Sequence, residues 1–150
     1  MPEGFVISFE NDWLWGVPLV VITVIFHVMG LGLLDRGVTM LFATKWFGRA
    51  SLFRFVVITG LSAFVATFLH AVEAVIWAYS YILIGALPGP RVAMFYSLNA
   101  ITSLGHDNIF LPPAYALLGP IESLNGIMLF GLTTAFLFAI LQRVWFLGQR

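Results

Sequence analysis

Cysteine is absent from the 150 residues, which excludes disulfide bonds and thiolate metal sites. Charge is also scarce: seven Lys and Arg balance seven Asp and Glu, so the chain has no basic surface for nucleic acid. Phosphate-binding glycine loops, the His-Glu-x-x-His motif and serine nucleophile motifs are missing too. We therefore expect no nucleic-acid partner, no enzymatic activity and no cofactor.

Apolar residues are abundant instead, at 61% of the chain with a mean hydropathy of +1.00. A helix needs about 20 apolar residues to cross a bilayer, and residues 13–34, 52–87 and 117–147 meet this requirement. The second segment is longer than one crossing needs, so it should tilt or project. Residues 91–101 are too short to span but suit a re-entrant helix, which Pro88-Gly89-Pro90 would start. The predicted fold is an all-α membrane protein with three transmembrane helices and one re-entrant helix.

The charges are distributed unevenly about these segments. Six of the seven basic residues follow the first segment or end the chain, and three acidic residues precede the first segment: Arg36, Lys45, Arg49, Arg54, Arg143 and Arg150 against Glu3, Glu10 and Asp12. The positive-inside rule then puts the N-terminus outside and the C-terminus in the cytoplasm. The acidic N-terminus lacks the basic region of a signal peptide, so we expect it to be retained. Residues 37–52 suit either an amphipathic helix on the inner surface or a basic loop.

Residues 95–108 read Phe-Tyr-Ser-Leu-Asn-Ala-Ile-Thr-Ser-Leu-Gly-His-Asp-Asn. This stretch resembles the pore helix and filter of bacterial two-helix potassium channels, where two aromatics and a serine precede Thr-Thr-Val-Gly-Tyr-Gly-Asp. Residues 126–135, Gly-Ile-Met-Leu-Phe-Gly-Leu-Thr-Thr-Ala, resemble the pore-lining inner helix of that family with its hinge glycine. The resemblance covers about residues 52–147. It divides the chain into an extra helix with a basic linker, residues 1–51, and a pore domain, residues 52–150.

The resemblance implies a homotetrameric cation channel in a bacterial-type inner (plasma) membrane, with lipid as its surroundings. It implies a gating hinge at Gly126 and Gly131, for which close helix packing is the alternative. It also implies an ion-conducting filter formed by Thr102, Ser103, Leu104, Gly105, His106, Asp107 and Asn108.

The filter departs from the family pattern in its outer half. Only Gly105 remains of the two glycines that allow left-handed backbone angles, and His106 and Asp107 replace the tyrosine and the second glycine. Four copies of Asp107 would form a ring of carboxylates that attracts divalent cations. We therefore expect K+ to pass, with Na+, Ca2+ or Mg2+ as further permeant ions, and no other metal site.

Ionisable and amide side chains within the apolar segments supply further candidates. His70 and Glu73 are three residues apart and share a helix face. From there they could support the filter through Asn99 or Glu122, handle protons or metal, or simply hydrogen-bond to each other. Glu122 and Asn125 are expected to support the filter. His27 lies alone in the first segment, and we assign it no role.

Two other functions stay open at this stage. A membrane carrier or enzyme coupled to protons or metal would use His70, Glu73 and Glu122, which could titrate or bind metal across a helix interface. A pore-like scaffold that does not conduct would be compatible with the missing filter glycine.

Overall fold

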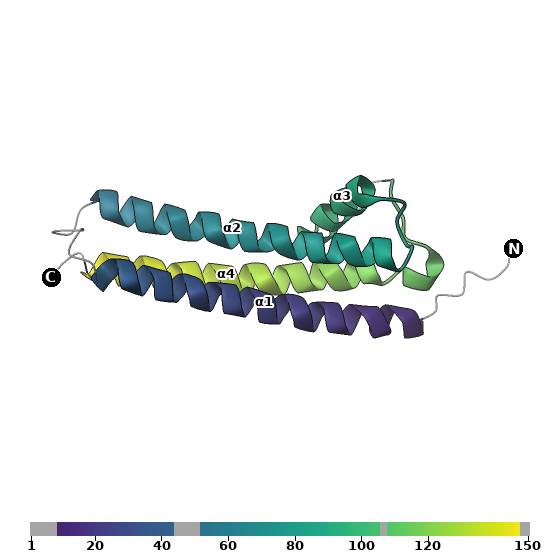
Figure 1. The fold of residues 1–150 in the computed structure, drawn as a ribbon, viewed down its shortest axis with the longest axis horizontal. Helices are drawn as coiled ribbons and strands as arrows, with labels where there is room; N and C mark the ends of the chain where they lie inside the picture. Colours follow the sequence, from purple (N-terminus) through teal and green to yellow (C-terminus); the bar gives the residue numbers. More distant parts are fainter. Residues whose placement is uncertain (1–8, 44–51, 106–107, 148–150) are drawn as a thin grey trace, which may run out of the picture.

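The computed structural model describes residues 9–43, 52–105 and 108–147. Within these ranges the chain is helical, with loops and no strand: α1 (Phe9–Ala43), α2 (Leu52–Leu83), α3 (Pro90–Ile101), the short 3-10 helix η1 (Pro113–Tyr115) and α4 (Leu118–Leu147). Three of them, α1, α2 and α4, are long and apolar enough to cross a membrane (Figure 1). The prediction of an all-α protein with three spanning helices is confirmed.

The helix ends differ from the sequence prediction at one important place. The first helix does not end near residue 34 but continues to Ala43, through Asp35 and Arg36. Residues 37–43 are therefore part of α1, and the expected separate surface helix or loop at 37–52 is wrong for them. The remaining linker residues, 44–51, lie outside the described residues. The continuation brings Asp35 next to Arg143 of α4, whose Nη1 lies 2.8 Å from Asp35 Oδ1.

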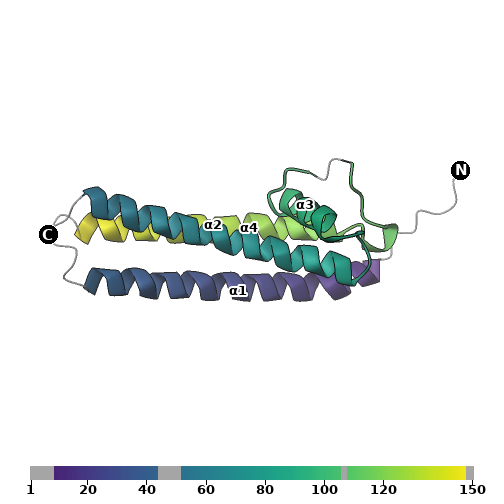
Figure 2. The ribbon, with the colours of Figure 1, turned by 45° about the horizontal axis from the view of Figure 1, so that its top comes forward.

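The three long helices form one bundle in which α1 and α4 run in the same direction and α2 runs against them (Figures 1 and 2). The short helix α3 packs on α2 and α4, at the end of the bundle where α1 begins and α2 ends. Proline at its first position fixes the backbone angle there, and Gly89 before it has φ 157°. The charged ends of Asp35 and Arg143 lie at the opposite end.

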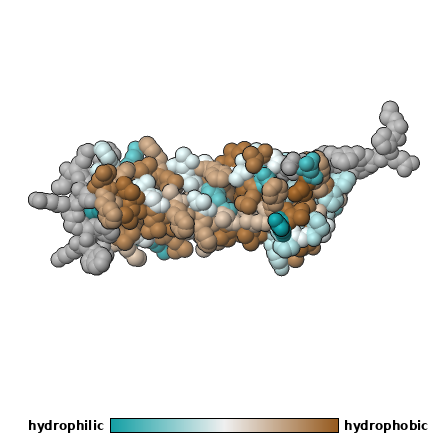
Figure 3. All heavy atoms as spheres, turned by 90° about the horizontal axis from the view of Figure 1, so that it is seen from above, coloured by the Kyte–Doolittle hydropathy of each residue, from teal (hydrophilic) through white to brown (hydrophobic). Residues whose placement is uncertain are grey.

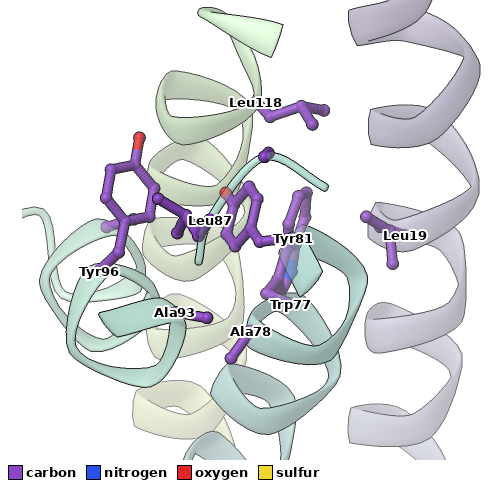
Figure 4. Packing of buried hydrophobic residues seen from close by; sticks show 10 residues of the cluster. Leu19, Trp77, Ala78, Tyr81, Leu87, Ala93, Tyr96 and Leu118 are labelled. Atoms are coloured by element: carbon purple, nitrogen blue, oxygen red, sulfur yellow. The ribbon is translucent and has the colours of Figure 1, made fainter. Parts of the chain in front are cut away.

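Apolar packing holds α3 in this place. Trp77 and Tyr81 of α2 are fully buried, and the Tyr96 ring of α3 meets the Tyr81 ring edge to face at a centroid distance of 5.2 Å (Figure 4). Leu19 of α1 and Leu118 of α4 belong to the same cluster. A second, smaller cluster forms near the other end of the bundle from Val38, Ile58, Ile140 and Val144. Apolar side chains also cover most of the visible outer surface between the ends (Figure 3), as expected for contact with lipid.

At Gly126 of α4 the end of α3 touches the bundle closely. A Cβ atom added there would lie 1.9 Å from the carbonyl oxygen of Ile101, the last residue of α3. Close packing therefore requires glycine at this position, and the role of Gly126 as a hinge stays a prediction. Gly131, the other predicted hinge residue, has no atom within 4 Å of such a Cβ.

We predict that Gly126→Ala destabilises the protein by about 1–3 kcal/mol, because the new methyl group must displace the backbone at the end of α3. Gly131→Ala is the matched control: it adds the same atom to the same helix in open space, and should be neutral or stabilising by up to about 1 kcal/mol. Thermal unfolding in detergent checks this. Equal stability of the two variants would contradict the close contact.

Candidate functional site

Polar side chains occupy one face of α4, and this face points into the bundle. Buried side chains on α4 recur at spacings of three, four or seven, as expected for a single helical face: Leu118, Glu122, Asn125, Leu129, Thr133, Ile140 and Val144. Three of the seven are polar, although lipid surrounds a spanning helix. Buried polar groups in a membrane must find partners within the protein, so their partners define the candidate site.

Glu122 connects α4 to both α2 and α3. Its Oε2 accepts a hydrogen bond of 2.6 Å from the Tyr81 hydroxyl, and its Oε1 accepts one from the Ser97 hydroxyl of α3. The Ser97 hydroxyl also lies 2.8 Å from the carbonyl oxygen of Ala74 in α2. The side chains of Glu122, Ser97 and Tyr81 are polar, and Glu122 and Ser97 are fully buried. This carboxyl group therefore joins α3 to the bundle, and the role of Glu122 in supporting the filter stays a prediction.

Asn125 connects α4 to α1, and its predicted support of the filter stays a prediction. Its Nδ2 donates a 2.8 Å hydrogen bond to Thr23 Oγ1, and the Thr23 hydroxyl donates to the carbonyl oxygen of Leu19. Asn125 is 1% exposed. Any support that it gives to α3 is indirect, through its neighbour Gly126.

His27, Glu73, His70 and Thr133 form a closed ring of hydrogen-bonding contacts near the middle of the bundle. Glu73 Oε1 lies 2.7 Å from His27 Nδ1, and Glu73 Oε2 lies 3.1 Å from His70 Nδ1. The other nitrogen of each imidazole, Nε2, lies 3.0 Å from Thr133 Oγ1. His27 belongs to α1 and Thr133 to α4, while Glu73 and His70 both belong to α2. We call this set the four-residue ring.

The four-residue ring corrects two expectations. His27 is not isolated, because it is fully buried and bonds to Glu73. Among the described residues, Glu73 bonds to the two histidines and not to Asn99 or Glu122, while Asn99 Nδ2 donates to the carbonyl oxygen of Phe95 in its own helix. Glu73 does lie at the depth of α3, since Ser97 reaches the neighbouring Ala74, but its side chain points toward α1.

A sequence signal for His27 was present. The residues of α1 that become buried are Asp12, Gly16, Leu19, Thr23, His27, Leu31 and Val38. Their spacing of three, four or seven marks one helical face, and polar or small residues fill four of the seven positions. This pattern assigns His27 to the face that packs on the other helices.

The predicted filter begins directly at the end of α3. The N–H groups of Thr102, Ser103 and Leu104 donate back to carbonyl oxygens of the last helical turn, and Ser103 has φ 56°. This is the Schellman arrangement, with Ser103 in the left-handed position usually taken by glycine. Gly105 follows with φ 105°. Leu104 is 80% exposed, and His106 and Asp107 lie outside the described residues.

No family model, curated protein or solved structure matches the chain. The resemblance to potassium channels thus depends on the residues quoted above.

We predict that Tyr81→Phe lowers the free energy of unfolding by about 1–3 kcal/mol, because it leaves a buried oxygen of Glu122 without its hydrogen-bond donor. Tyr79→Phe is the matched control, since Tyr79 lies on the same helix but is 60% exposed, and its loss should change stability by less than about 0.5 kcal/mol. Thermal unfolding of both variants in one detergent gives the comparison. A harmless Tyr81→Phe would mean that Glu122 does not depend on this bond.

Proposed function

We propose that four copies of this chain form a cation channel, with α3 as the pore helix, residues 102–108 as the filter and α4 as the inner helix. The observation that carries the proposal is the fixed position of α3. A twelve-residue helix, too short to span, is held between α2 and α4 by buried hydrogen bonds through Ser97 and by the contact of Ile101 with Gly126.

The backbone after α3 supports a role in ion binding. The C-terminal end of a helix carries a partial negative charge, and backbone carbonyls beyond it can replace the hydration shell of a cation. Left-handed angles at Ser103 and Gly105 change the direction of successive peptide groups, which a row of converging carbonyls requires. The exposed Leu104 between them is available to a neighbouring copy.

A single chain provides one wall of such a pore, so the proposal needs a homotetramer around a central axis. The face of α4 away from the bundle is apolar and exposed, with Leu124 and Ile127 close to the level of Gly126. In the proposed assembly part of this surface meets neighbouring copies and the rest meets lipid. Asp107 would add a ring of carboxylates at the outer entrance, so K+, Na+ and divalent cations are all candidate permeant ions.

The proposed orientation follows the charge distribution. Arg36, Arg54 and Arg143 belong to the end of the bundle away from α3, while Glu10 and Asp12 begin α1 at the α3 end. The positive-inside rule then places α3 and the filter toward the outside of a bacterial-type plasma membrane, with the C-terminus in the cytoplasm.

Proton- or metal-coupled transport is the second candidate. Ligand atoms of His27, His70 and Glu73 lie within 4.8 Å of one another, as a transport site would require. Glu122, however, bonds to Ser97 and Tyr81, so the sequence-based trio of His70, Glu73 and Glu122 is divided between two separate networks. We therefore favour the channel.

We predict that purified protein in planar bilayers carries cation current, and that Gly105→Ala reduces it at least tenfold, because a Cβ strains the backbone at φ 105°. Gly85→Ala is the matched control: Gly85 also has a positive φ, 69°, but lies in the loop between α2 and α3. Reversal potentials under opposed K+ and Na+ gradients, then K+ and Ca2+ gradients, report the selectivity.

Current that is the same in wild type, Gly105→Ala and Asp107→Asn would contradict the assignment of the filter. A correctly assembled tetramer that never conducts would instead support a scaffold, and metal- or proton-driven flux that does not depend on residues 102–108 would support the carrier.

A further inference from the structure

When Glu73 is ionised and both histidines are neutral, the four-residue ring has more contacts than hydrogens to fill them. It contains four N···O contacts of 2.7–3.1 Å, two at the Glu73 carboxyl group and two at the Thr133 hydroxyl. An ionised carboxylate only accepts, a neutral imidazole donates from one nitrogen, and a hydroxyl has one hydrogen. Ionised Glu73 with two neutral histidines therefore supplies three hydrogens. In one of the four contacts, two acceptor atoms would then face each other.

One additional proton completes the ring in either of two ways. The proton can sit on an imidazole, so that this histidine donates to Glu73 through Nδ1 and to Thr133 through Nε2. It can also sit on Glu73, so that every group donates once and accepts once around the ring. Both arrangements contain four hydrogens, and both give the ring zero net charge. We propose that this ring is a proton-binding site that holds one proton shared among His27, Glu73 and His70.

Burial favours this neutral state. His27 and Glu73 are fully buried and His70 is 9% exposed, so a lone carboxylate charge among spanning helices would be very costly. The other ionisable side chains nearby are engaged elsewhere: Glu122 with Ser97 and Tyr81, and Asp35 with Arg143. At the start of α1, Asp12 Oδ1 accepts from the backbone N–H of Leu117. A shared proton is thus the nearest source of compensating charge.

Aromatic stacking identifies where a positive charge is best placed. The His70 ring stacks on Phe130 of α4 with a centroid distance of 4.1 Å and an interplanar angle of 24°. The face of a phenyl ring attracts a cation within about 6 Å. The two imidazoles are 5.0 Å apart and tilted by 37°. We therefore place the imidazolium form on His70.

A divalent metal ion fits the same atoms less well. Ligands about 2.0–2.1 Å from a tetrahedral Zn2+ lie roughly 3.3 Å from one another, whereas Glu73 Oε1 and His27 Nδ1 are 2.7 Å apart. A divalent ion with Glu73 as the single carboxylate would also leave one buried positive charge. The proton gives both the observed spacing and a neutral site.

The site explains a role for α1, which the pore-domain resemblance does not cover. The ring joins α1 through His27, α2 through Glu73 and His70, and α4 through Thr133. Loss of the shared proton would leave Glu73 charged and one contact repulsive, which would weaken the attachment of α1 to α2 and α4. This proton site exists whether or not the tetramer conducts.

The decisive experiment is nitrogen-15 solid-state NMR of histidine-labelled wild-type protein in bilayers at about pH 8, where free histidine and glutamate are both deprotonated. Only three histidines occur in the chain, and the signals of His106 are identified with His106→Asn. Infrared spectra of wild type and Glu73→Gln report whether Glu73 is a carboxylic acid, with Glu122→Gln as the control that removes a buried carboxyl group outside the ring.

We expect one proton per chain: either one imidazolium with an ionised Glu73, or two neutral histidines with a protonated Glu73. Thr133→Val should weaken proton binding, because it removes the partner of both Nε2 atoms, while Thr133→Ser should retain it. Two neutral histidines with an ionised Glu73, two imidazolium rings, or a stoichiometric metal ion in the purified wild-type protein would each overturn the proposal.

Discussion

Buried carboxyl groups in a bundle surrounded by lipid must be partnered by the protein itself, and this constraint sets how the helices of this chain are arranged. Glu122 takes hydroxyl groups from α2 and α3, and Glu73 takes imidazoles from α1 and α2. If one of these helices rotated, or if α3 moved, one of the carboxyl groups would lose its partner, at a cost of several kcal/mol. The apolar surfaces alone would allow many rotations, since lipid and leucine are similar environments.

The two carboxyl groups connect different helices. Glu122 lies behind α3 and, together with the contact at Gly126, fixes the direction in which the short helix points. Glu73 lies nearer the middle of the bundle and attaches α1 to the other long helices. Because His70 contacts Thr133 on the same face of α4 that carries Glu122, α4 is the helix through which both networks act. In the proposed channel this is the inner helix.

Hydropathy and turn signals predicted the number of spanning helices and the start of α3 at Pro90 because both depend on local composition. They could not predict which side chains meet across helices, since a uniformly apolar helix gives little information about its rotation. His27 was therefore read as isolated, although its spacing from Thr23 and Gly16 marks the packed face of α1. The charges of Asp35 and Arg36 suggested that the first helix had ended, but Asp35 continues it and pairs with Arg143 of α4. The filter prediction depends on the motif, and the structure adds the left-handed angles of Ser103 and Gly105.

The central claim is that α3 is anchored in order to point residues 102–108 at a shared axis. Electron cryo-microscopy of the purified protein in lipid nanodiscs tests this most directly, because it reports stoichiometry and the direction of α3 together. We predict a fourfold assembly in which the C-terminal ends of the four α3 helices face the centre and α1 lies at the periphery. A monomer, an assembly of another symmetry, or a tetramer with α3 facing lipid would contradict the account.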